Sequence, residues 1–320
     1  MTHPSQKLPA TAHLETAATF EASVDGALIR GSRAGRGSPV LLLHGFPQTR
    51  LEWHRVWRDL AARHTVVATD LRGYGASEAH DNDFTFRTMA RDQVAAMDQL
   101  GFDRFHVVAH DRGARVAHRM CVDSPESVIS VTLIDIVPTA VVWERMDADI
   151  ARAYWHWAFL AQHDPGVAAM VAAAPEQLVR ACLAPGILAG AISPGAQRAY
   201  EDAAARPGVQ RAFIGDYRAA AGADLVIDAA EPSTSPTPAL ILWGERSIVP
   251  RIADPRDAWR RIFPDARFAS LPAGHFIPEE SPAGLLSALR PFLEQADWSS
   301  PTTVPYRGTP GCAQHGLEQR

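Results

Sequence analysis

The segment FHVVAHDRGAR, residues 105–115, decides the fold that this chain is expected to adopt. Its first six residues form a largely apolar run, which is typical of a strand buried on both faces of a sheet. A helical pattern follows from Arg112 to Val122, before a break at Ser124-Pro125. We therefore expect a sharp turn from strand to helix, with the carboxylate of Asp111 at its apex.

The same alternation of strands and helices extends along the chain. It indicates an α/β fold with a mostly parallel sheet and flanking helices on both faces. We expect eight strands, at TFEASV, ALIRGS, PVLLLHG, HTVVATDL, FHVVAH, SVTLIDIV, PALILWG and ARFASLP. Further helices are expected at 51–62 and 85–100. Chemistry should gather where the strands end, because the carboxyl ends of parallel strands meet at one edge.

The strand pattern stops after Val137 and returns only at PALILWG. The intervening sequence is Ala-rich and helical, carries the aromatic cluster YWHWAF at 154–159, and ends in the Pro/Ser/Thr-rich linker EPSTSPTP. Both ends of the chain are polar or rich in Pro and Gly and lack periodicity. The predicted units are a flexible tail at 1–17, a core at 18–137 and 233–297, a helical lid at 138–232, and a flexible tail at 298–320.

The composition favours a small-molecule partner. The 320 residues include 31 Lys and Arg against 36 Asp and Glu, a net charge of −5, and no long run of one sign suggests a nucleic-acid or membrane surface. Three widely spaced cysteines indicate neither a disulfide framework nor a zinc site. The N-terminus lacks the apolar core of a signal peptide. We expect a cytoplasmic protein.

Asp111 is a candidate nucleophile. The N-terminus of the following helix favours an anion, and Gly113 allows a close backbone approach. A carboxylate needs no proton removed before it attacks carbon, and its product with an alkyl halide is an ester that water can cleave later. The alternative is that Asp111 only caps the helix, which is a common role for Asp. Partners elsewhere in the chain must decide between the two.

A second motif, LLLHGFPQT at 41–49, resembles the H-G-x-P turn of the α/β-hydrolase superfamily. In that turn the amide of the residue after glycine, here Phe46, forms an oxyanion hole with the amide of the residue after the nucleophile, here Arg112. DLRGYGAS at 70–77 resembles another turn of the same superfamily. These matches favour the nucleophile over the helix cap.

The other two members of a catalytic triad also have candidates. ASLPAGHF places His275 just beyond the last strand, where the triad base belongs. The acid has two possible places, and the later one, three residues after the glycine of PALILWG, holds Ser247 rather than Asp. LIDIVPT instead puts Asp135 at the end of the strand after the nucleophile helix. We assign Asp135 as the acid and keep Glu245 as a weaker substitute.

Five segments, HDRGARVAHRM, LIDIVPT, ARAYWHW, DYRAA and RFASLPAGHF, resemble the fluoroacetate (haloacetate) dehalogenase family of that superfamily. The likeness runs from about residue 20 to about residue 293, and Ala109 and Ala114 depart from it, since glycine is usual there. It implies that Arg112 and Arg115 bind the substrate carboxylate. It also implies a halide pocket made of His156, Trp157 and Tyr217, no metal or organic cofactor, and a homodimer.

The expected reaction is the hydrolysis of a haloacetate, including fluoroacetate, to glycolate and halide through an ester on Asp111. His275 would activate the water that cleaves this ester. An epoxide hydrolase with the same Asp-His-Asp chemistry is the first alternative, with proton donors among Tyr154, Tyr200 and Tyr217. A catalytically silent protein that binds a small acid is a second, and a serine esterase is excluded because no serine occupies the turn.

Overall fold

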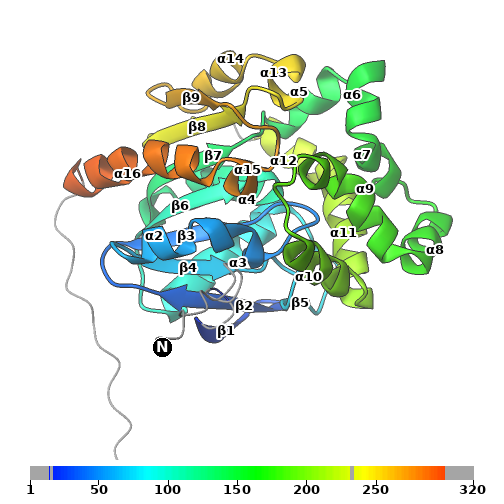
Figure 1. The fold of residues 1–320 in the computed structure, drawn as a ribbon, viewed down its shortest axis with the longest axis horizontal. Helices are drawn as coiled ribbons and strands as arrows, with labels where there is room; N and C mark the ends of the chain where they lie inside the picture. The colour runs from blue at the N-terminus through cyan, green and yellow to red at the C-terminus, as the bar shows by residue number, and fades with distance from the viewer. Residues whose placement is uncertain (1–13, 15–16, 231–233, 300–320) are drawn as a thin grey trace, which may run out of the picture.

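The computed structural model describes Leu14, residues 17–230 and residues 234–299. Most of both predicted tails, and the start of the Pro-rich linker, lie outside these residues. Helix α16 (Pro282–Ser299) runs two residues into the segment predicted as the C-terminal tail. The α/β class expected from the sequence is confirmed (Figure 1).

The described residues form one mixed sheet of nine strands in the order β1-β2-β4-β3-β6-β7-β8-β9, with β5 paired to β2. From β4 to β9 all neighbouring strands are parallel, whereas β2 is antiparallel to β1, β4 and β5. The expected number of eight was wrong because β5 has only two residues, too few for an alternating pattern. The strands are β1 Ala18–Val24, β2 Ala27–Ala34, β3 Pro39–Leu43, β4 Thr65–Thr69, β5 Glu78–Ala79, β6 Phe105–His110, β7 Val128–Ile134, β8 Ala239–Gly244 and β9 Arg267–Leu271.

Helices cover this sheet. The expected helix at 51–62 is divided into η1 (Arg50–Arg55) and α2 (Trp57–Ala61), because Val56 bonds back to the Trp53 carbonyl in a tighter turn. The remaining core helices are α3 Phe86–Gln99, α4 Asp111–Asp123, η2 Pro125–Ser127, α13 Val249–Ile252, α14 Pro255–Arg260, α15 Ile277–Glu280 and α16.

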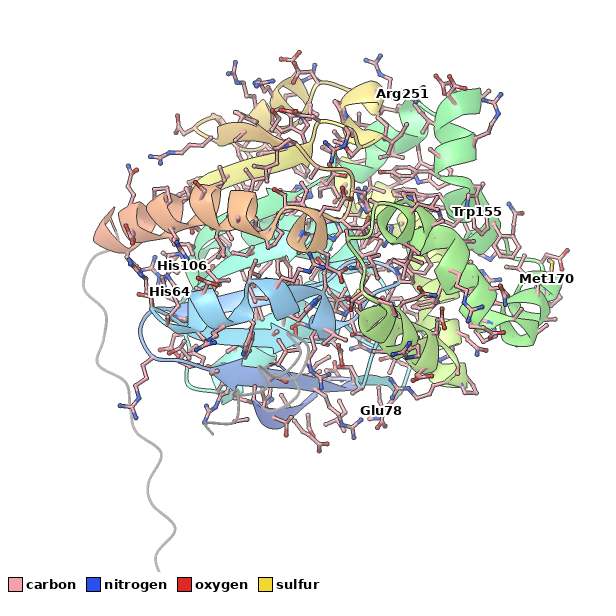
Figure 2. The ribbon with its side chains drawn as sticks, in the orientation of Figure 1. His64, Glu78, His106, Trp155, Met170 and Arg251 are labelled. Carbon is pink, nitrogen blue, oxygen red and sulfur yellow. The ribbon has the colours of Figure 1, made fainter. Side chains whose placement is uncertain are left out.

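A helical layer lies between β7 and β8 in the sequence and to one side of the sheet (Figure 1, green). Its helices are α5 Thr139–Glu144, α6 Ala148–Ala153, α7 Trp155–Leu160, α8 Pro165–Ala173, α9 Pro175–Leu188, α10 Pro194–Ala204, α11 Pro207–Ala220 and α12 Ala223–Ala230. Trp155 and Met170 lie on its outer side, 38% and 56% exposed (Figure 2). Among the described residues no single helix could cross a membrane; α8 and α9 have the required length and hydropathy only together, across a bend of 84°.

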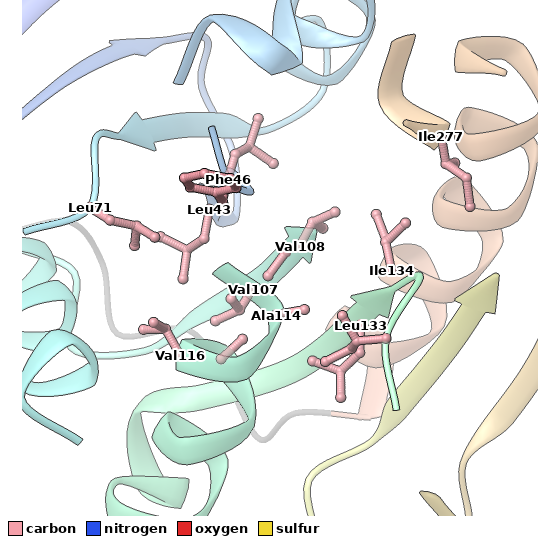
Figure 3. Close-up of a cluster of buried hydrophobic side chains, with 14 of the residues drawn as sticks. Leu43, Phe46, Leu71, Val107, Val108, Ala114, Val116, Leu133, Ile134 and Ile277 are labelled. Carbon is pink, nitrogen blue, oxygen red and sulfur yellow. The ribbon is translucent and has the colours of Figure 1, made fainter. Parts of the chain in front are cut away.

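The core lies where β6 and its neighbours meet helix α4. Val107 and Val108 are fully buried and, as neighbours on one strand, point to opposite faces of the sheet. Ala114 and Val116 of α4 pack in the same cluster (Figure 3). The Gly113 amide donates to the His44 carbonyl at 2.9 Å, so the start of α4 lies directly against the end of β3. This contact holds the strand-to-helix turn in place.

We predict that Gly113→Ala destabilises the protein. A Cβ at residue 113 would lie 2.5 Å from the Leu43 carbonyl oxygen and 2.6 Å from that of His44, and backbone cannot move aside cheaply. The free energy of unfolding in urea should fall by about 1–3 kcal/mol. Gly208→Ala is the control, because a Cβ there meets nothing within 4 Å, and it should be neutral or stabilise by at most about 1 kcal/mol. Equal effects of the two substitutions would contradict this account of the turn.

Candidate active site

Two aspartates adopt unusual backbone conformations at the carboxyl ends of neighbouring strands. Asp111, after β6, has φ of +47°, and Asp135, after β7, has φ of +54°. Both values lie in the left-handed region that non-glycine residues rarely occupy, and such residues concentrate at functional sites. Gly45 permits the turn, because a Cβ there would lie 2.7 Å from the Cβ of Asp111.

His275 lies between the two aspartates. Its Nδ1 is 2.6 Å from Oδ2 of Asp135, and its Nε2 is 3.8 Å from Oδ2 of Asp111. Since Asp135 is fully buried and accepts through Oδ2, it holds the imidazole with Nε2 directed at Asp111. This arrangement can orient a base beside a nucleophile, and it brings together the three residues expected to form a triad.

Ser247 lies at the alternative position for the triad acid, but it serves as a hydrogen-bond donor to the acid. Its hydroxyl donates to Oδ1 of Asp135 at 2.8 Å, and the amide of Gly244 donates to the same oxygen at 2.8 Å. Ser247, at the second possible position of the triad acid, therefore supports Asp135, which occupies the first. Glu245, the weaker substitute, is exposed and accepts from the Ser270 hydroxyl at 2.9 Å, so it does not face His275.

The carboxylate of Asp111 is buried but stays ionised. Burial alone would raise its pKa, but the nearby side chains of His275, His110 and Arg112 and a hydrogen bond from the Phe46 amide lower the pKa below its usual value. The Phe46 amide donates to Oδ1 at 2.9 Å. Phe46 thus lies where an oxyanion donor is expected; the Arg112 amide, the second expected donor, stays a prediction.

Arg112 and Arg115 are buried beside Asp111, but they differ in their partners. Arg112 is bound on one edge by Asp216: Nε donates to Oδ2 at 2.9 Å, and Nη2 contacts Oδ1 and, at 3.1 Å, the backbone carbonyl. Tyr74 donates its hydroxyl to Oδ2 of Asp216 at 2.6 Å. The charge of Arg112 is therefore paired, and among the described residues its Nη1 has no hydrogen-bond partner.

No carboxylate pairs with Arg115 among the described residues. Its Nη1 donates to the Val137 carbonyl at 3.0 Å and to the Thr139 hydroxyl at 2.9 Å, while Nε lies buried without a partner. Burial and the nearby Arg112 lower the pKa of Arg115, and the charge of Asp111 opposes them only in part. The buried donors left without a partner are thus Nη1 of Arg112 and Nε of Arg115.

The three residues expected to bind halide form a cluster with Phe46. The ring of Tyr217 lies 5.5 Å from that of His156 and 5.8 Å from that of Trp157, and Phe46 stacks on His156 at 5.6 Å. The Tyr217 hydroxyl and Nδ1 of His156 are buried without hydrogen-bond partners in the described part of the chain. Burial lowers the pKa of His156 to about 3, so this ring is neutral.

Sequence patterns missed Asp216 as a partner of Arg112. It directly precedes Tyr217 in DYRAA, but 104 residues separate it from Arg112, and no local spacing relates them. A carboxylate partner could have been expected on chemical grounds, because two buried arginines in one helical turn, Arg112 and Arg115, require a counter-charge. Asp216, the acidic residue next to Tyr217, was the candidate for it.

Known proteins resemble this chain over most of its length. A family model described as alpha/beta hydrolase fold matches residues 38–282. A fluoroacetate dehalogenase from Burkholderia sp is 40% identical over 271 residues, which cover 82% of this chain and 89% of that protein. A soluble epoxide hydrolase from Corynebacterium sp. (strain C12) is 28% identical over 281 residues, 85% of this chain and 96% of that protein.

A solved structure agrees with the same fold. A protein from Nostoc sp PCC 7120, assigned to the α/β hydrolases, superposes with a TM-score of 0.83 at 40% identity, and the match covers 88% of this chain and 99% of that one. The similarity therefore includes the helical layer between β7 and β8 as well as the sheet.

We predict that Asp216→Asn destabilises the protein strongly, because it leaves the buried charge of Arg112 unpaired. The free energy of unfolding should fall by about 3–5 kcal/mol in urea titrations. Glu201→Gln is the matched control: Glu201 pairs with Arg180 at 2.7 Å, but that arginine is 48% exposed, so the loss should stay below about 1 kcal/mol. A loss for Asp216→Asn as small as that of the control would show that Arg112 does not depend on this partner.

Proposed function

We propose that this chain, which belongs to the haloacetate dehalogenase family of the α/β-hydrolase superfamily, hydrolyses the carbon–halogen bond of short 2-haloacids such as fluoroacetate. The α/β-hydrolase fold expected from the sequence is confirmed by the family model and by the solved structure. The observation that carries the proposal is a buried, ionised Asp111 close to His275 and Asp135, together with a buried Arg115 that no carboxylate pairs with among the described residues.

The first step is displacement of the halide. Oδ1 of Asp111 is engaged by the Phe46 amide, which leaves Oδ2 as the attacking atom. Oδ2 forms a bond to the α-carbon while the carbon–halogen bond breaks, and the halide leaves with the bonding electron pair. The product is an ester between Asp111 and the glycolyl group.

The second step is hydrolysis of this ester. The gap of 3.8 Å between Nε2 of His275 and Oδ2 of Asp111 suits a water that attacks Cγ and gives its proton to Nε2. Asp135 stabilises the imidazolium that results, and the Phe46 amide stabilises negative charge on Oδ1. Collapse of the intermediate breaks the bond from Cγ to Oδ2, and the glycolate oxygen takes the proton from His275 as it leaves. The remaining proton of the water is lost from the carboxyl group of Asp111 to solvent, which restores the carboxylate.

The arginines favour an acid as the substrate. A carboxylate that accepts from Nη1 of Arg112 and Nε of Arg115 would satisfy two buried donors and compensate the charge of Arg115. A neutral substrate would leave that charge unpaired, which is costly in a buried site. The leaving halide would accept hydrogen bonds in the cluster of His156, Trp157 and Tyr217. Such donors stabilise fluoride more than the larger halides, because the charge of fluoride is more concentrated.

Epoxide hydrolysis is the second candidate, favoured by the 28% identical relative and by the unpaired hydroxyl of Tyr217. That hydroxyl could donate to the oxygen of an opening epoxide, after attack by the same carboxylate. The charge of Arg115, which no carboxylate pairs with among the described residues, argues against this neutral substrate. The haloacid is therefore preferred.

Free halide is the direct test of the proposed function. The purified protein is incubated separately with fluoroacetate, chloroacetate and the neutral analogue chloroacetamide, and Asp111→Asn gives the background. We expect halide from both acids and at least about 100-fold lower efficiency with the amide. Chloride alone would remove fluoroacetate from the proposal, and halide from neither acid would contradict it.

We predict that His275→Asn separates the two steps. Displacement needs no base, so halide should still be released, but only about once per active site, because the ester is no longer hydrolysed. Mass spectrometry of the peptide with Asp111 should then find a carboxymethyl group on the carboxylate. Unmodified Asp111 after one equivalent of halide has been released would contradict the covalent route.

We predict that Tyr217→Phe affects fluoride more than chloride. Loss of one hydrogen bond to a developing anion should slow defluorination by about 10- to 100-fold, whereas chloride release should change by no more than about threefold, because chloride leaves readily without help. Rates of halide release from the two acids give the comparison. Equal slowing for both would show that the hydroxyl does not contact the leaving group.

A further inference from the structure

A fully buried imidazole lies directly behind the nucleophile. His110 is the last residue of β6 and precedes Asp111. Its Nε2 is 2.8 Å from the backbone carbonyl oxygen of His275. Because a carbonyl can only accept a hydrogen bond, Nε2 must carry a hydrogen and donate it. The ring of His110 is thereby tied to the loop that carries the expected base.

The other nitrogen of this ring faces a buried carboxyl group. Nδ1 of His110 is 2.9 Å from Oε1 of Glu52, and both side chains are 0% exposed. Within the described residues neither atom makes a hydrogen bond of ordinary geometry, so the 2.9 Å approach is an ion-pair contact. Two unprotonated acceptors at this distance would repel each other in a buried site, so at least one of them carries a proton.

The surroundings place that proton on the imidazole. The other oxygen of Glu52, Oε2, accepts a hydrogen bond from the Gly45 amide at 2.8 Å, which favours the ionised carboxylate. Burial alone would lower the pKa of His110, but Glu52, Asp111 and Asp135 outweigh it and raise the pKa to about 9. Both ring nitrogens are then protonated at neutral pH.

We propose that His110 is a charged imidazolium paired with Glu52. This pair positions His275 and the turn at Gly45 and Phe46 around Asp111 for hydrolysis of the ester. The pair joins three separate parts of the site: Glu52 holds the amide of Gly45, next to Phe46; His110 begins the strand-to-helix turn; and its Nε2 holds the carbonyl of His275. His110 and Glu52 touch neither substrate nor water in this scheme, so they are positioning residues.

A second buried glutamate supplies a matched control. Glu279 is also 0% exposed, and its Oε2 accepts from the side chain of Gln48 at 2.6 Å. Burial and the nearby charge of Glu52 raise the pKa of Glu279 to about 8, so it is mostly uncharged at pH 7. Replacement by Gln therefore removes a charge at residue 52 but not at residue 279, with the same change in shape.

The charge of His110 can be measured without turnover. Nitrogen–proton correlation spectra of the ring are recorded at pH 7 on protein with 15N-labelled histidine, and His110→Gln identifies the signal by its loss. We expect protons on both ring nitrogens in the wild type and in Glu279→Gln, and on Nε2 alone in Glu52→Gln. A neutral ring in the wild type would overturn the proposal, and the wild-type spectrum tests it whether or not Glu52→Gln folds.

The role of the His110–Glu52 pair in ester hydrolysis rests on the proposed function, and a separate kinetic measurement tests it. Rapid mixing with chloroacetate resolves the first chloride release from the later hydrolysis of the ester. Glu52→Gln should slow hydrolysis by about 10- to 100-fold, as expected for a misplaced base, and displacement by no more than about threefold; Glu279→Gln should leave both within about threefold. Unchanged hydrolysis in Glu52→Gln would overturn the positioning role, whereas absence of chloride release from the wild type would count against the proposed function and leave the charge of His110 standing.

Discussion

A carboxylate that attacks carbon must remain ionised in a place from which water is largely excluded. Asp111 is 7% exposed, and its burial opposes the charge that the reaction needs. Nearby cations and the Phe46 amide outweigh that penalty and keep its pKa low. The rest of the site depends on how these charges are arranged, because each buried cation also needs compensation.

The arrangement divides the cations into two kinds. Arg112 is paired with Asp216 and His110 with Glu52, and all four side chains are fully buried. Such pairs fix geometry without leaving a large net charge. Arg115 has backbone and hydroxyl acceptors but no carboxylate among the described residues, which leaves its charge for an anionic substrate. The proposed preference for a haloacid over a neutral epoxide rests on this difference.

The strand pattern around Asp111 predicted the turn, and the chain order predicted that His275 and Asp135 would meet it at the ends of parallel strands. These predictions were possible because hydrophobic periodicity and turn residues are local signals. The partners of the buried charges were not predictable in that way. Asp216 lies 104 residues from Arg112, and Glu52 follows the oxyanion motif at a position that no pattern distinguishes. Ser247 was noticed only as a missing acid, although its hydroxyl supports Asp135.

The most direct test of the account is a single turnover with enzyme in excess over chloroacetate in 18O-labelled water. Water that attacks Cγ of an ester leaves its oxygen in the carboxylate of Asp111, and glycolate leaves with an oxygen that came from Asp111. The account therefore predicts 18O in the peptide that contains Asp111 and unlabelled oxygen in the new hydroxyl of glycolate. Label in glycolate, with none in Asp111, would mean that water displaces the halide directly and would contradict a covalent role for this carboxylate.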